Sequence, residues 1–305
     1  MAHPVTPGAD LRALIAAPHP DEAALPPAAP VGNGTRLLRG VPYADLPGAR
    51  PLELDLYLPD RAPDTGPSPL VLFVHGGAWR RGRREDMGYR MRDWTPGPLA
   101  RIAAAGFAVA AADYRLSGEA VFPAPLDDLR HALRWLGLRA AELGIDARRT
   151  VVWGESAGGH LASLLALSPE ACHVSGAIAW YAPSDLTLDG DDPTTPHALL
   201  LGAAPDAVPD LARAASPLAR VHAGAPSFLL AHGTHDSMVD CDHSRRLAAR
   251  LEAVGASVEL VMVPGADHVW HQLPDDQVEK VFTHSQEWAR RLVNEGRRQD
   301  SAGVV

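Results

Sequence analysis

Hydrophobic residues recur with two different periods along the chain, and each period predicts a type of secondary structure. Between residues 52 and 58, leucine occupies every second position, which is typical of a strand with one covered face. Elsewhere, short and continuous apolar runs are typical of strands that are buried on both faces of a sheet. These runs are residues 70–74, 107–111, 150–153, 174–180, 227–231 and 257–263.

Leucines spaced by three or four residues separate these runs and predict amphipathic helices. The clearest series are Leu126, Leu129, Leu133 and Leu136, then Leu247, Leu251 and Val254, and the apolar residues within 159–167. Because strands and helices alternate from residue 70 onward, we predict an α/β fold with a mostly parallel central sheet and helices on both faces. The earlier strand, with its alternating pattern, predicts an antiparallel edge.

Composition predicts how the chain is divided. Residues 1–35 are rich in proline, alanine and glycine, so we expect an N-terminal extension with a short helix at residues 10–17. Residues 36–293 predict one domain, and residues 294–305 a flexible tail. Residues 184–219 interrupt the strand–helix alternation, which predicts a cap insertion over the C-terminal edge of the sheet, where such sheets bind ligands.

The totals exclude several classes of protein. The 305 residues carry a net charge of −9, which argues against a nucleic-acid binder or a membrane-surface protein. Residues 1–17 contain no basic segment followed by a long apolar core, so we expect neither a signal peptide nor a membrane span, and predict a cytoplasmic protein. The two cysteines, Cys172 and Cys241, predict no disulfide framework. The sequence does not determine the oligomeric state, and a homodimer is one alternative.

The most informative motif is Gly154-Glu155-Ser156-Ala157-Gly158, which follows a predicted strand and precedes a predicted helix. This context predicts a nucleophile elbow, a sharp turn that presents a serine at its tip. The flanking glycines relieve crowding where strand and helix pack closely. A serine hydroxyl is a weak nucleophile near neutral pH, so Ser156 needs a base to accept its proton and an acid to orient that base.

The candidate acid and base also follow predicted strands. Asp236 comes shortly after one apolar run, and His268 comes shortly after the last. Because parallel strands end at the same edge of a sheet, we expect Ser156, Asp236 and His268 to meet there, in the chain order of α/β hydrolases. The alternatives are Asp240 and Asp242 for the acid and His271 for the base.

A second glycine-containing motif directly follows the first buried strand: it reads His75-Gly76-Gly77-Ala78-Trp79. In acyl transfer, negative charge develops on the carbonyl oxygen, and each backbone N–H group aimed at that oxygen lowers the barrier by about 3 kcal/mol. Adjacent glycines let the backbone approach the substrate closely. We therefore predict an oxyanion hole formed by the N–H groups of Gly76, Gly77 and Ala157.

Other residues have both a binding and a structural interpretation. Side chains that either line a substrate pocket or pack in the core are Trp79, Tyr181, Met238, Val239 and Trp270. Arginines that either bind an anionic substrate group or, more often, form a solvated surface are Arg80, Arg81, Arg83 and Arg84. A weak zinc signal comes from His232, His235, Asp236, Asp240 and His243, and we expect no metal there.

Taken together, these motifs resemble those of the hormone-sensitive-lipase-like and BD-FAE-type esterases of the α/β-hydrolase superfamily. Residues 113–117, which read Asp-Tyr-Arg-Leu-Ser, and residues 122–128 resemble the stretch ahead of the elbow in that family. The resemblance extends over roughly residues 50–293 and implies an α/β-hydrolase fold and carboxylic ester hydrolysis without a cofactor. Ala78 replaces a third glycine and Gly118 replaces a proline, so the branch and the substrate stay open.

We therefore expect a serine hydrolase that cleaves a small to medium carboxylic ester through an acyl-enzyme formed on Ser156. The same site is also compatible with an aryl formamidase, another amide hydrolase or an acyltransferase. A lyase or cyclase that acts on a specialised metabolite is a further alternative. A non-catalytic binding protein is disfavoured by the complete set of motifs. Fold alone does not decide among these.

Overall fold

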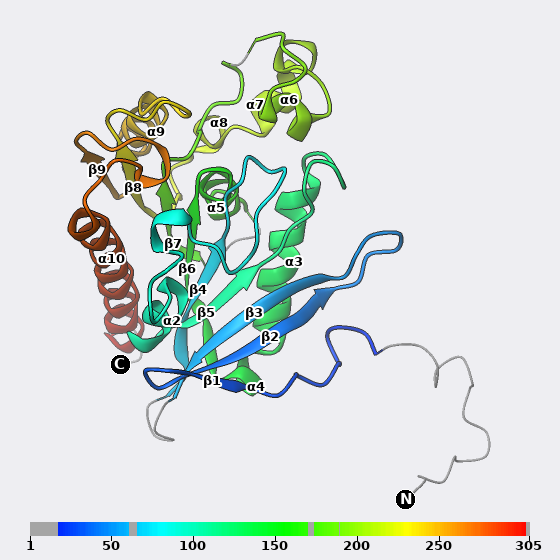
Figure 1. Ribbon diagram of the computed structural model, residues 1–305, viewed down its shortest axis with the longest axis vertical. Helices are drawn as coiled ribbons and strands as arrows, with labels where there is room; N and C mark the ends of the chain where they lie inside the picture. The colour runs from blue at the N-terminus through cyan, green and yellow to red at the C-terminus, as the bar shows by residue number, and fades with distance from the viewer. Residues whose placement is uncertain (1–17, 61–65, 170–173, 189, 303–305) are drawn as a thin grey trace, which may run out of the picture.

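The structure of the protein, a computed structural model, describes residues 18–60, 66–169, 174–188 and 190–302. These residues form a nine-stranded sheet with the order β1-β2-β3-β5-β4-β6-β7-β8-β9 (Figure 1). The helix predicted at residues 10–17 and the predicted absence of a disulfide at Cys172 lie outside the described residues.

The strands of the sheet confirm the predicted architecture. They are β1 (Ala29–Gly32), β2 (Thr35–Ala44), β3 (Leu52–Pro59), β4 (Ser68–Val74), β5 (Ala108–Ala112), β6 (Ile145–Glu155), β7 (Val174–Trp180), β8 (Ser227–Gly233) and β9 (Val258–Val263). The pairs β1–β2, β2–β3 and β3–β5 are antiparallel, and all pairs from β5 to β9 are parallel. Every apolar run of the sequence therefore forms a strand, and the early alternating run belongs to the antiparallel edge.

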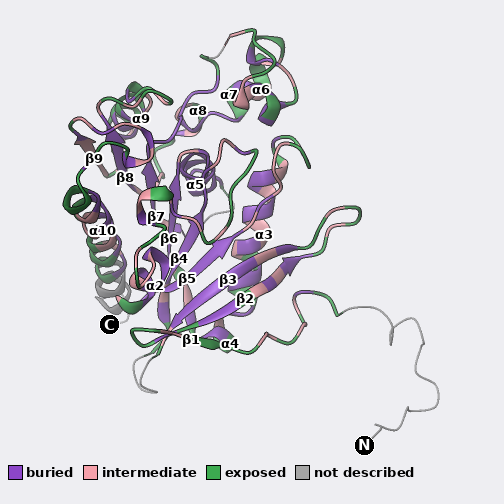
Figure 2. Ribbon diagram, viewed as in Figure 1, coloured by how far each residue is buried: buried purple, intermediate pink, exposed green. Residues whose placement is uncertain are grey.

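Helices cover both faces of the sheet. They are α2 (Pro98–Ala104), α3 (Ala124–Leu138), α4 (Ala140–Leu143), α5 (Ala157–Ala166), α6 (Pro196–Leu201), α7 (Pro209–Ala214), α8 (Pro217–Arg220), α9 (Asp242–Ala253) and α10 (Asp275–Ala302), with 3-10 turns η2 (Tyr89–Met91), η3 (Pro205–Ala207) and η4 (His268–Trp270). Helices α3, α5 and α9 pack on one face, and α2 and α10 on the other (Figures 1 and 2). None of the helices within the described residues is long and apolar enough to span a bilayer.

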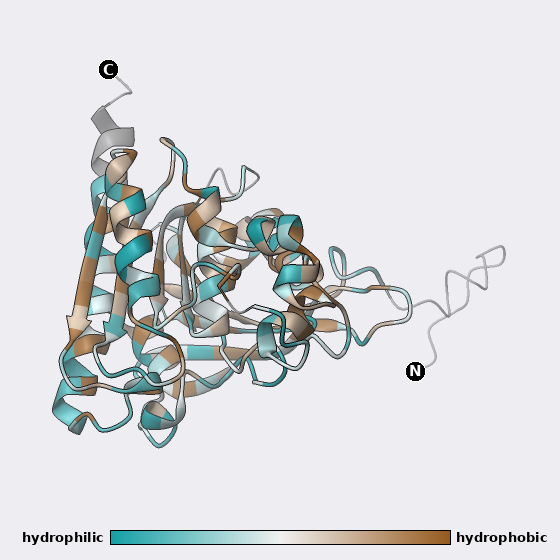
Figure 3. Cartoon of the chain, turned by 90° about the horizontal axis from the view of Figure 1, so that it is seen from above, coloured by the Kyte–Doolittle hydropathy of each residue, from teal (hydrophilic) through white to brown (hydrophobic). Residues whose placement is uncertain are grey.

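Two hydrophobic cores explain why the central strands are apolar throughout. In β4, Leu70 and Leu72 belong to the core under α3 and α5, while Val71 and Phe73 belong to the core under α2 and α10. A strand covered on both faces needs apolar residues at successive positions. The outer helices need only one apolar side, and Figure 3 shows both brown and teal residues along the helix that leads to the C-terminus.

The sheet and the last helix extend beyond the predicted domain boundaries. Residues 29–35, which we expected in the extension, form β1 and the start of β2. Strand β1 is short and largely exposed, and it contains Pro30, so its sequence carries little strand signal. At the other end, α10 continues to residue 302 through positions that we expected in a flexible tail.

The parallel strands end at a common edge, which gathers the loops that carry the predicted chemistry. Residue Val74 of β4 pairs with Gly154 of β6, and Gly233 of β8 pairs with Val263 of β9. The segments after these strands therefore leave the sheet on the same side.

The predicted cap insertion lies at the top of the view in Figure 1, where α6 and α7 stand above the sheet. Helix α6 begins after Thr195, whose hydroxyl accepts the N–H of Ala198 at 3.1 Å and so caps the helix. The insertion is joined to the rest of the protein by a hydrogen bond from the N–H of Phe122 to the carbonyl of Leu200 at 2.8 Å.

Candidate active site

Ser156 lies at the tip of a sharp turn between β6 and α5. Its backbone has φ 52° and ψ −122°, a conformation that is strained for a residue with a side chain. The N–H of Ser156 donates to the carbonyl of Trp180 at 2.8 Å, and the N–H of His160 donates to the carbonyl of Ser156 at 3.0 Å. This is the geometry of a nucleophile elbow, which presents the hydroxyl at the edge of the sheet.

Close packing requires both glycines of the elbow motif. A Cβ atom on Gly154 would lie 2.2 Å from the carbonyl oxygen of Gly158, and one on Gly158 would lie 2.1 Å from the carbonyl oxygen of Val74. These neighbours are backbone atoms, so they cannot rotate away from the added carbon. The glycines therefore let β4, β6 and α5 approach one another, which places Ser156 beside the loop that follows β4.

The ring of His268 lies between Ser156 and Asp236. Its Nε2 atom is 3.0 Å from the Ser156 hydroxyl oxygen, and its Nδ1 atom is 2.8 Å from Asp236 Oδ2. An ionised carboxylate only accepts, so Nδ1 carries the proton and Nε2 of the neutral ring can accept one from the serine. Asp267 fixes the turn that holds this ring, because its Oδ1 accepts the N–H groups of His268 and Ser237, both at 2.7 Å.

Several donors hold the carboxylate of Asp236. Its Oδ1 accepts the N–H groups of Met238 at 2.9 Å and Val239 at 2.8 Å, and its Oδ2 lies 3.3 Å from His232 Nε2 as well as near His268. Burial raises the pKa of Asp236, but the hydrogen bonds from His232 and His268 outweigh this effect and hold the pKa well below its usual range. An ionised acid at this position stabilises a protonated His268.

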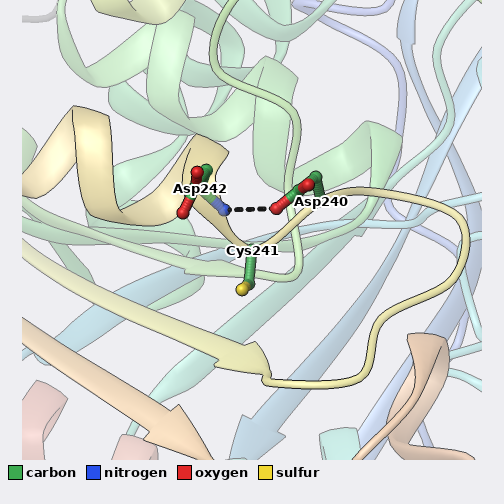
Figure 4. Close-up of side chains that lie close together, drawn as sticks. All are labelled: Asp240, Cys241 and Asp242. Atoms are coloured by element: carbon green, nitrogen blue, oxygen red, sulfur yellow. Dashed lines mark hydrogen bonds between the residues drawn. The ribbon is translucent and has the colours of Figure 1, made fainter.

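The alternative acids and the alternative base have other contacts. Asp240 Oδ1 accepts the N–H of Asp242 at 2.9 Å at the start of α9, and the Cys241 side chain points away from both carboxylates (Figure 4). His271 Nδ1 lies 2.5 Å from the hydroxyl of Tyr89 at the surface. The geometry thus favours Asp236 and His268 over their rivals.

The structure corrects the predicted role of Gly76. Its N–H donates to Glu155 Oε1 at 2.6 Å, so this donor is already engaged and does not face a substrate oxygen. Glu155 is the residue before the nucleophile, and its carboxyl group is buried. Burial raises the pKa of Glu155, while the hydrogen bond from Gly76 opposes that rise. The sequence predicts for Glu155 local hydrogen bonds that orient the elbow and no part in catalysis, and the structure shows that its partner is the N–H of Gly76.

The other two predicted donors remain available, and a third residue joins them. Within the described part of the chain, the N–H groups of Gly77 and Ala78 have no hydrogen-bond partner. Ala157 is the first residue of α5, so its N–H has no partner within the helix. Ala78 and Trp79 have φ values of 56° and 55°, which turn the loop sharply after Gly77. No pattern in the sequence marks Ala78, because such backbone angles are unusual outside glycine.

Three of the five predicted pocket residues, Trp79, Tyr181 and Trp270, are buried in the core. Trp270 is 0% exposed and Tyr181 1%, and their rings are 4.8 Å apart, with Tyr181 4.9 Å from the ring of His268. They have no surface to offer a substrate, which corrects their assignment as pocket walls. Trp79 is 2% exposed and fills the core under the second motif. Met238, at 70%, is the most exposed of the predicted set, and Val239 is partly buried.

The four arginines after the second motif divide into two kinds. Arg84 donates to Asp55 at 2.8 Å and to Asp113 at 2.6 Å, and it pairs with Glu53 at 3.1 Å. These acids belong to or follow strands β3 and β5, so Arg84 anchors the loop to the sheet. The remaining three, Arg80, Arg81 and Arg83, are exposed. The solvated interpretation therefore fits these three residues, and Arg84 is structural.

Within the described residues, the side chains behind the weak zinc signal do not come together as one group of metal ligands. His232 is buried and its Nδ1 lies 2.7 Å from the hydroxyl of Ser244, while His235 is exposed. Among the described residues, the acidic and cysteine groups close enough for one ion are those drawn in Figure 4. The hydrogen bond from the N–H of Asp242 to Asp240, at the start of α9, accounts for the arrangement of these residues.

Comparison with known proteins places this geometry in a family. Residues 54–251 match the BD-FAE family. The chain belongs to this family. Two relatives from Mycobacterium tuberculosis are Esterase LipC, which is 31% identical over 226 residues, and Esterase LipQ, which is 30% identical over 250 residues. The alignments cover 67% and 75% of this chain but 53% and 56% of the relatives, so the chain spans about half the length of these esterases.

Solved structures confirm the α/β-hydrolase fold of this BD-FAE member. A truncated carbohydrate esterase from gut microbiota has a TM-score of 0.72 and 24% identity, over 85% of this chain and 96% of that chain. Esterase Est2 of Thermogutta terrifontis, with propionate bound, has a TM-score of 0.68 and 25% identity, over 85% of this chain and 94% of that chain. The family resemblance expected from the motifs is confirmed by the match to the BD-FAE family over residues 54–251.

Proposed function

We propose that the protein hydrolyses carboxylic esters through a catalytic triad of Ser156, His268 and Asp236. The observation that carries the proposal is the unbroken series of contacts from the serine hydroxyl to His268 at 3.0 Å and from His268 to Asp236 at 2.8 Å. This series begins at a strained elbow, which is where α/β hydrolases hold their nucleophile. Membership of the BD-FAE family and the names of the mycobacterial esterases support the same reaction.

The reaction has two halves. His268 Nε2 accepts the proton of Ser156 as the hydroxyl oxygen attacks the ester carbonyl carbon, and the protonated ring then donates that proton to the departing alcohol. A water molecule next attacks the acyl-enzyme and gives its proton to His268. Collapse of the second tetrahedral intermediate releases the acid and returns the proton to Ser156. Asp236 stays ionised and keeps the proton of the neutral ring on Nδ1.

The oxyanion formed in each half requires N–H donors. We assign Gly77, Ala78 and Ala157, because their N–H groups are unpaired among the described residues and belong either to the elbow or to the loop after β4, whose start packs against it. Donors fixed before the reaction stabilise the developing charge without reorganisation, and loss of one costs on the order of 10²–10³ in kcat. Gly76 has a different role, which is to hold the start of the loop against Glu155.

The substrate is proposed to be a small to medium ester, bound beneath the insertion at residues 184–219. The two ends of this insertion are tied together, since the N–H of Leu218 donates to the carbonyl of Ser184 at 2.9 Å. We retain the predicted division into an N-terminal extension and one hydrolase domain, with the sheet beginning at β1.

Two measurements test the proposed function. The first is a panel of p-nitrophenyl esters from acetate to octanoate, run beside an N-formyl aryl amine so that ester and formamide cleavage are compared directly. The second is labelling by a fluorophosphonate, with the modified residue located by mass spectrometry. Ser156→Ala should retain the circular dichroism spectrum of the wild type, lose the label and lose about 10⁶ in kcat. Activity within tenfold of wild type in this variant would exclude a covalent mechanism on Ser156.

A further inference from the structure

His160 is a buried histidine whose two ring nitrogens contact different parts of the protein. It lies on α5 one turn after Ser156 and has no exposed surface. Its Nδ1 atom is 3.2 Å from Nε1 of Trp79, in the loop after β4. Its Nε2 atom is 2.7 Å from the carbonyl oxygen of Ala215, at the end of α7 in the insertion. One side chain thus touches the nucleophile helix, the oxyanion loop and the insertion.

The partners of His160 determine where its proton resides. The carbonyl of Ala215 only accepts, so Nε2 must carry the hydrogen; the indole of Trp79 only donates, so Nδ1 must be unprotonated. A neutral ring satisfies both contacts at once, and a charged ring would present a hydrogen to the indole N–H. Burial lowers the pKa of His160 to about 3, although the hydrogen bond to Ala215 opposes this shift. The neutral ring is therefore the working form at ordinary pH.

The indole of Trp79 restrains a strained segment. Ala78 and Trp79 both have positive φ angles, which residues with side chains rarely adopt and which persist only when their surroundings hold them. The carbonyl oxygen of Trp79 accepts the N–H of Ser117 at 2.8 Å. The indole ring of Trp79 lies edge-on to the rings of His160 and of His197 in α6, with ring centroids 5.0 and 5.2 Å apart. The indole N–H bond links this loop to the helix of the nucleophile.

We infer that His160 is a positioning residue for the oxyanion hole, and that its Nδ1 acts by holding Trp79 and hence the N–H groups of Gly77 and Ala78. The inference rests on the proposed ester hydrolysis, because it concerns the donors of the same site. Its second nitrogen connects this support to the insertion through Ala215.

Two substitutions separate the two contacts of His160. In His160→Asn, the amide oxygen takes a place close to that of Nδ1 and can accept the indole N–H, while the contact with Ala215 is lost. In His160→Gln, the longer amide reaches the Ala215 carbonyl in place of Nε2, while the indole loses its acceptor. If the role of His160 were purely structural, the kcat of each variant would fall in proportion to its loss of stability. A positioning role makes kcat depend on the indole contact alone.

The experiment measures kcat and KM on p-nitrophenyl acetate and the inhibition constant of an aryl trifluoromethyl ketone, which forms a tetrahedral adduct with a serine. We expect His160→Gln to lower kcat about tenfold, less than complete loss of an oxyanion donor, with KM nearly unchanged. The inhibition constant should rise by the same factor. His160→Asn should keep kcat within about threefold of wild type, although its midpoint of urea unfolding should fall. Equal kcat values in the two variants would overturn the inference.

A third variant keeps the test decisive if His160→Gln does not fold. Trp79→Phe keeps an aromatic ring in the core but removes the N–H donor to His160 together with part of the indole. It should reproduce the loss of kcat and the weaker inhibition, and a wild-type value for both would overturn the inference. Failure of the wild-type enzyme to hydrolyse any ester or to react with the fluorophosphonate is a different outcome, since it overturns the proposed function itself.

Discussion

Glu155, the residue before Ser156, has a buried carboxyl group that accepts a backbone N–H. It is not hydrogen-bonded to Ser156, His268 or Asp236. Its Oε1 accepts the N–H of Gly76, and a Cβ atom on Gly76 would lie only 2.2 Å from that oxygen. The glycine is thus needed for close approach of the acid, and not for contact with a substrate. A buried N–H that loses its acceptor is destabilising by about 1–3 kcal/mol.

Substitutions at Glu155 should separate its hydrogen bond from its charge. We predict that Glu155→Gln keeps kcat within about threefold of wild type, because the amide oxygen can still accept the Gly76 N–H. Glu155→Ala should lower the free energy of unfolding by about 1–3 kcal/mol and reduce kcat, because the start of the oxyanion loop loses its acceptor. Steady-state kinetics and urea unfolding check both effects. If the glutamine variant is as inactive as the alanine variant, the charge of Glu155 matters and its hydrogen bond does not.

The identity of the catalytic acid gives a second prediction at the scale of residues. Asp236→Asn should lower kcat by about 10³–10⁴, because an amide favours the wrong tautomer of His268 and cannot balance the charge of its protonated ring. Asp240→Asn is the matched control, since Asp240 caps the start of α9 and does not touch His268. The two variants are compared with the wild type by their kcat values on one ester, which identifies the catalytic acid. A large loss in the Asp240 variant with little change in the Asp236 variant would reverse the assignment.

At the scale of elements, the elbow depends on the approach of α5 to β4 and β6. We predict that Gly158→Ala lowers the free energy of unfolding by more than about 3 kcal/mol, since overpacking against backbone atoms typically costs about 1–3 kcal/mol or more. Gly137, in α3, has open space around the position of an added Cβ. Gly137→Ala should therefore raise stability by up to about 1 kcal/mol through helix propensity. Urea unfolding of the pair distinguishes crowding at the elbow from a general effect of alanine.

The insertion is the element that we expect to choose the substrate. Its loops leave the sheet at the edge where Ser156, Asp236 and His268 lie, and loops at such edges commonly carry specificity. A folded variant with a shortened segment between residues 184 and 219 should change KM and chain-length preference more than kcat on acetate. Because one methylene is worth about 1–3 kcal/mol in a pocket, shifts of about 10–200-fold are the expected scale. An unchanged profile across the p-nitrophenyl esters would place specificity elsewhere.

At the scale of the whole molecule, two buried histidines link stability to pH. Burial lowers the pKa of His75, and burial lowers that of His160 from 6.5 to about 3. Below about pH 6.5, each histidine binds a proton in the unfolded chain but not in the folded protein. The contribution of each histidine to the free energy of unfolding is therefore fully present above that pH and is lost as the pH falls toward the pKa of the folded state. Within this window, His160 contributes a slope of up to about 1.4 kcal/mol per pH unit, and His75 contributes in the same direction.

This linkage predicts a measurable difference between wild type and His160→Asn. The free energy of unfolding of the wild type should fall between pH 6 and pH 4.5, a range above most carboxyl pKa values. The asparagine variant should show a shallower slope, because it lacks one titrating group, whatever its stability at neutral pH. Urea unfolding at four or five pH values gives both slopes. Parallel curves for the two proteins would mean that His160 does not titrate on unfolding.

The fold follows from the amino-acid sequence alone, and so does the expectation that Ser156, Asp236 and His268 lie close together. Apolar runs, which both faces of a parallel sheet require, predict the buried strands, and helical leucine spacing predicts α3 and α9. The positions of Ser156, Asp236 and His268 follow from one rule of topology, that parallel strands end at a common edge. The short edge strand β1 could not be predicted in this way, because an exposed strand with proline needs no apolar pattern.

The surroundings of Ser156, Asp236 and His268 are set by contacts between distant segments of the chain. The N–H of Gly76 is taken by Glu155, Ala78 adopts a backbone conformation that its side chain disfavours, and Trp270 is buried beneath His268. Each of these facts depends on side-chain directions and on backbone angles that the folded protein imposes. A motif specifies residue types at fixed spacing, but the direction of an N–H group or an indole ring is fixed by the packing of strands and helices that the motif does not contain.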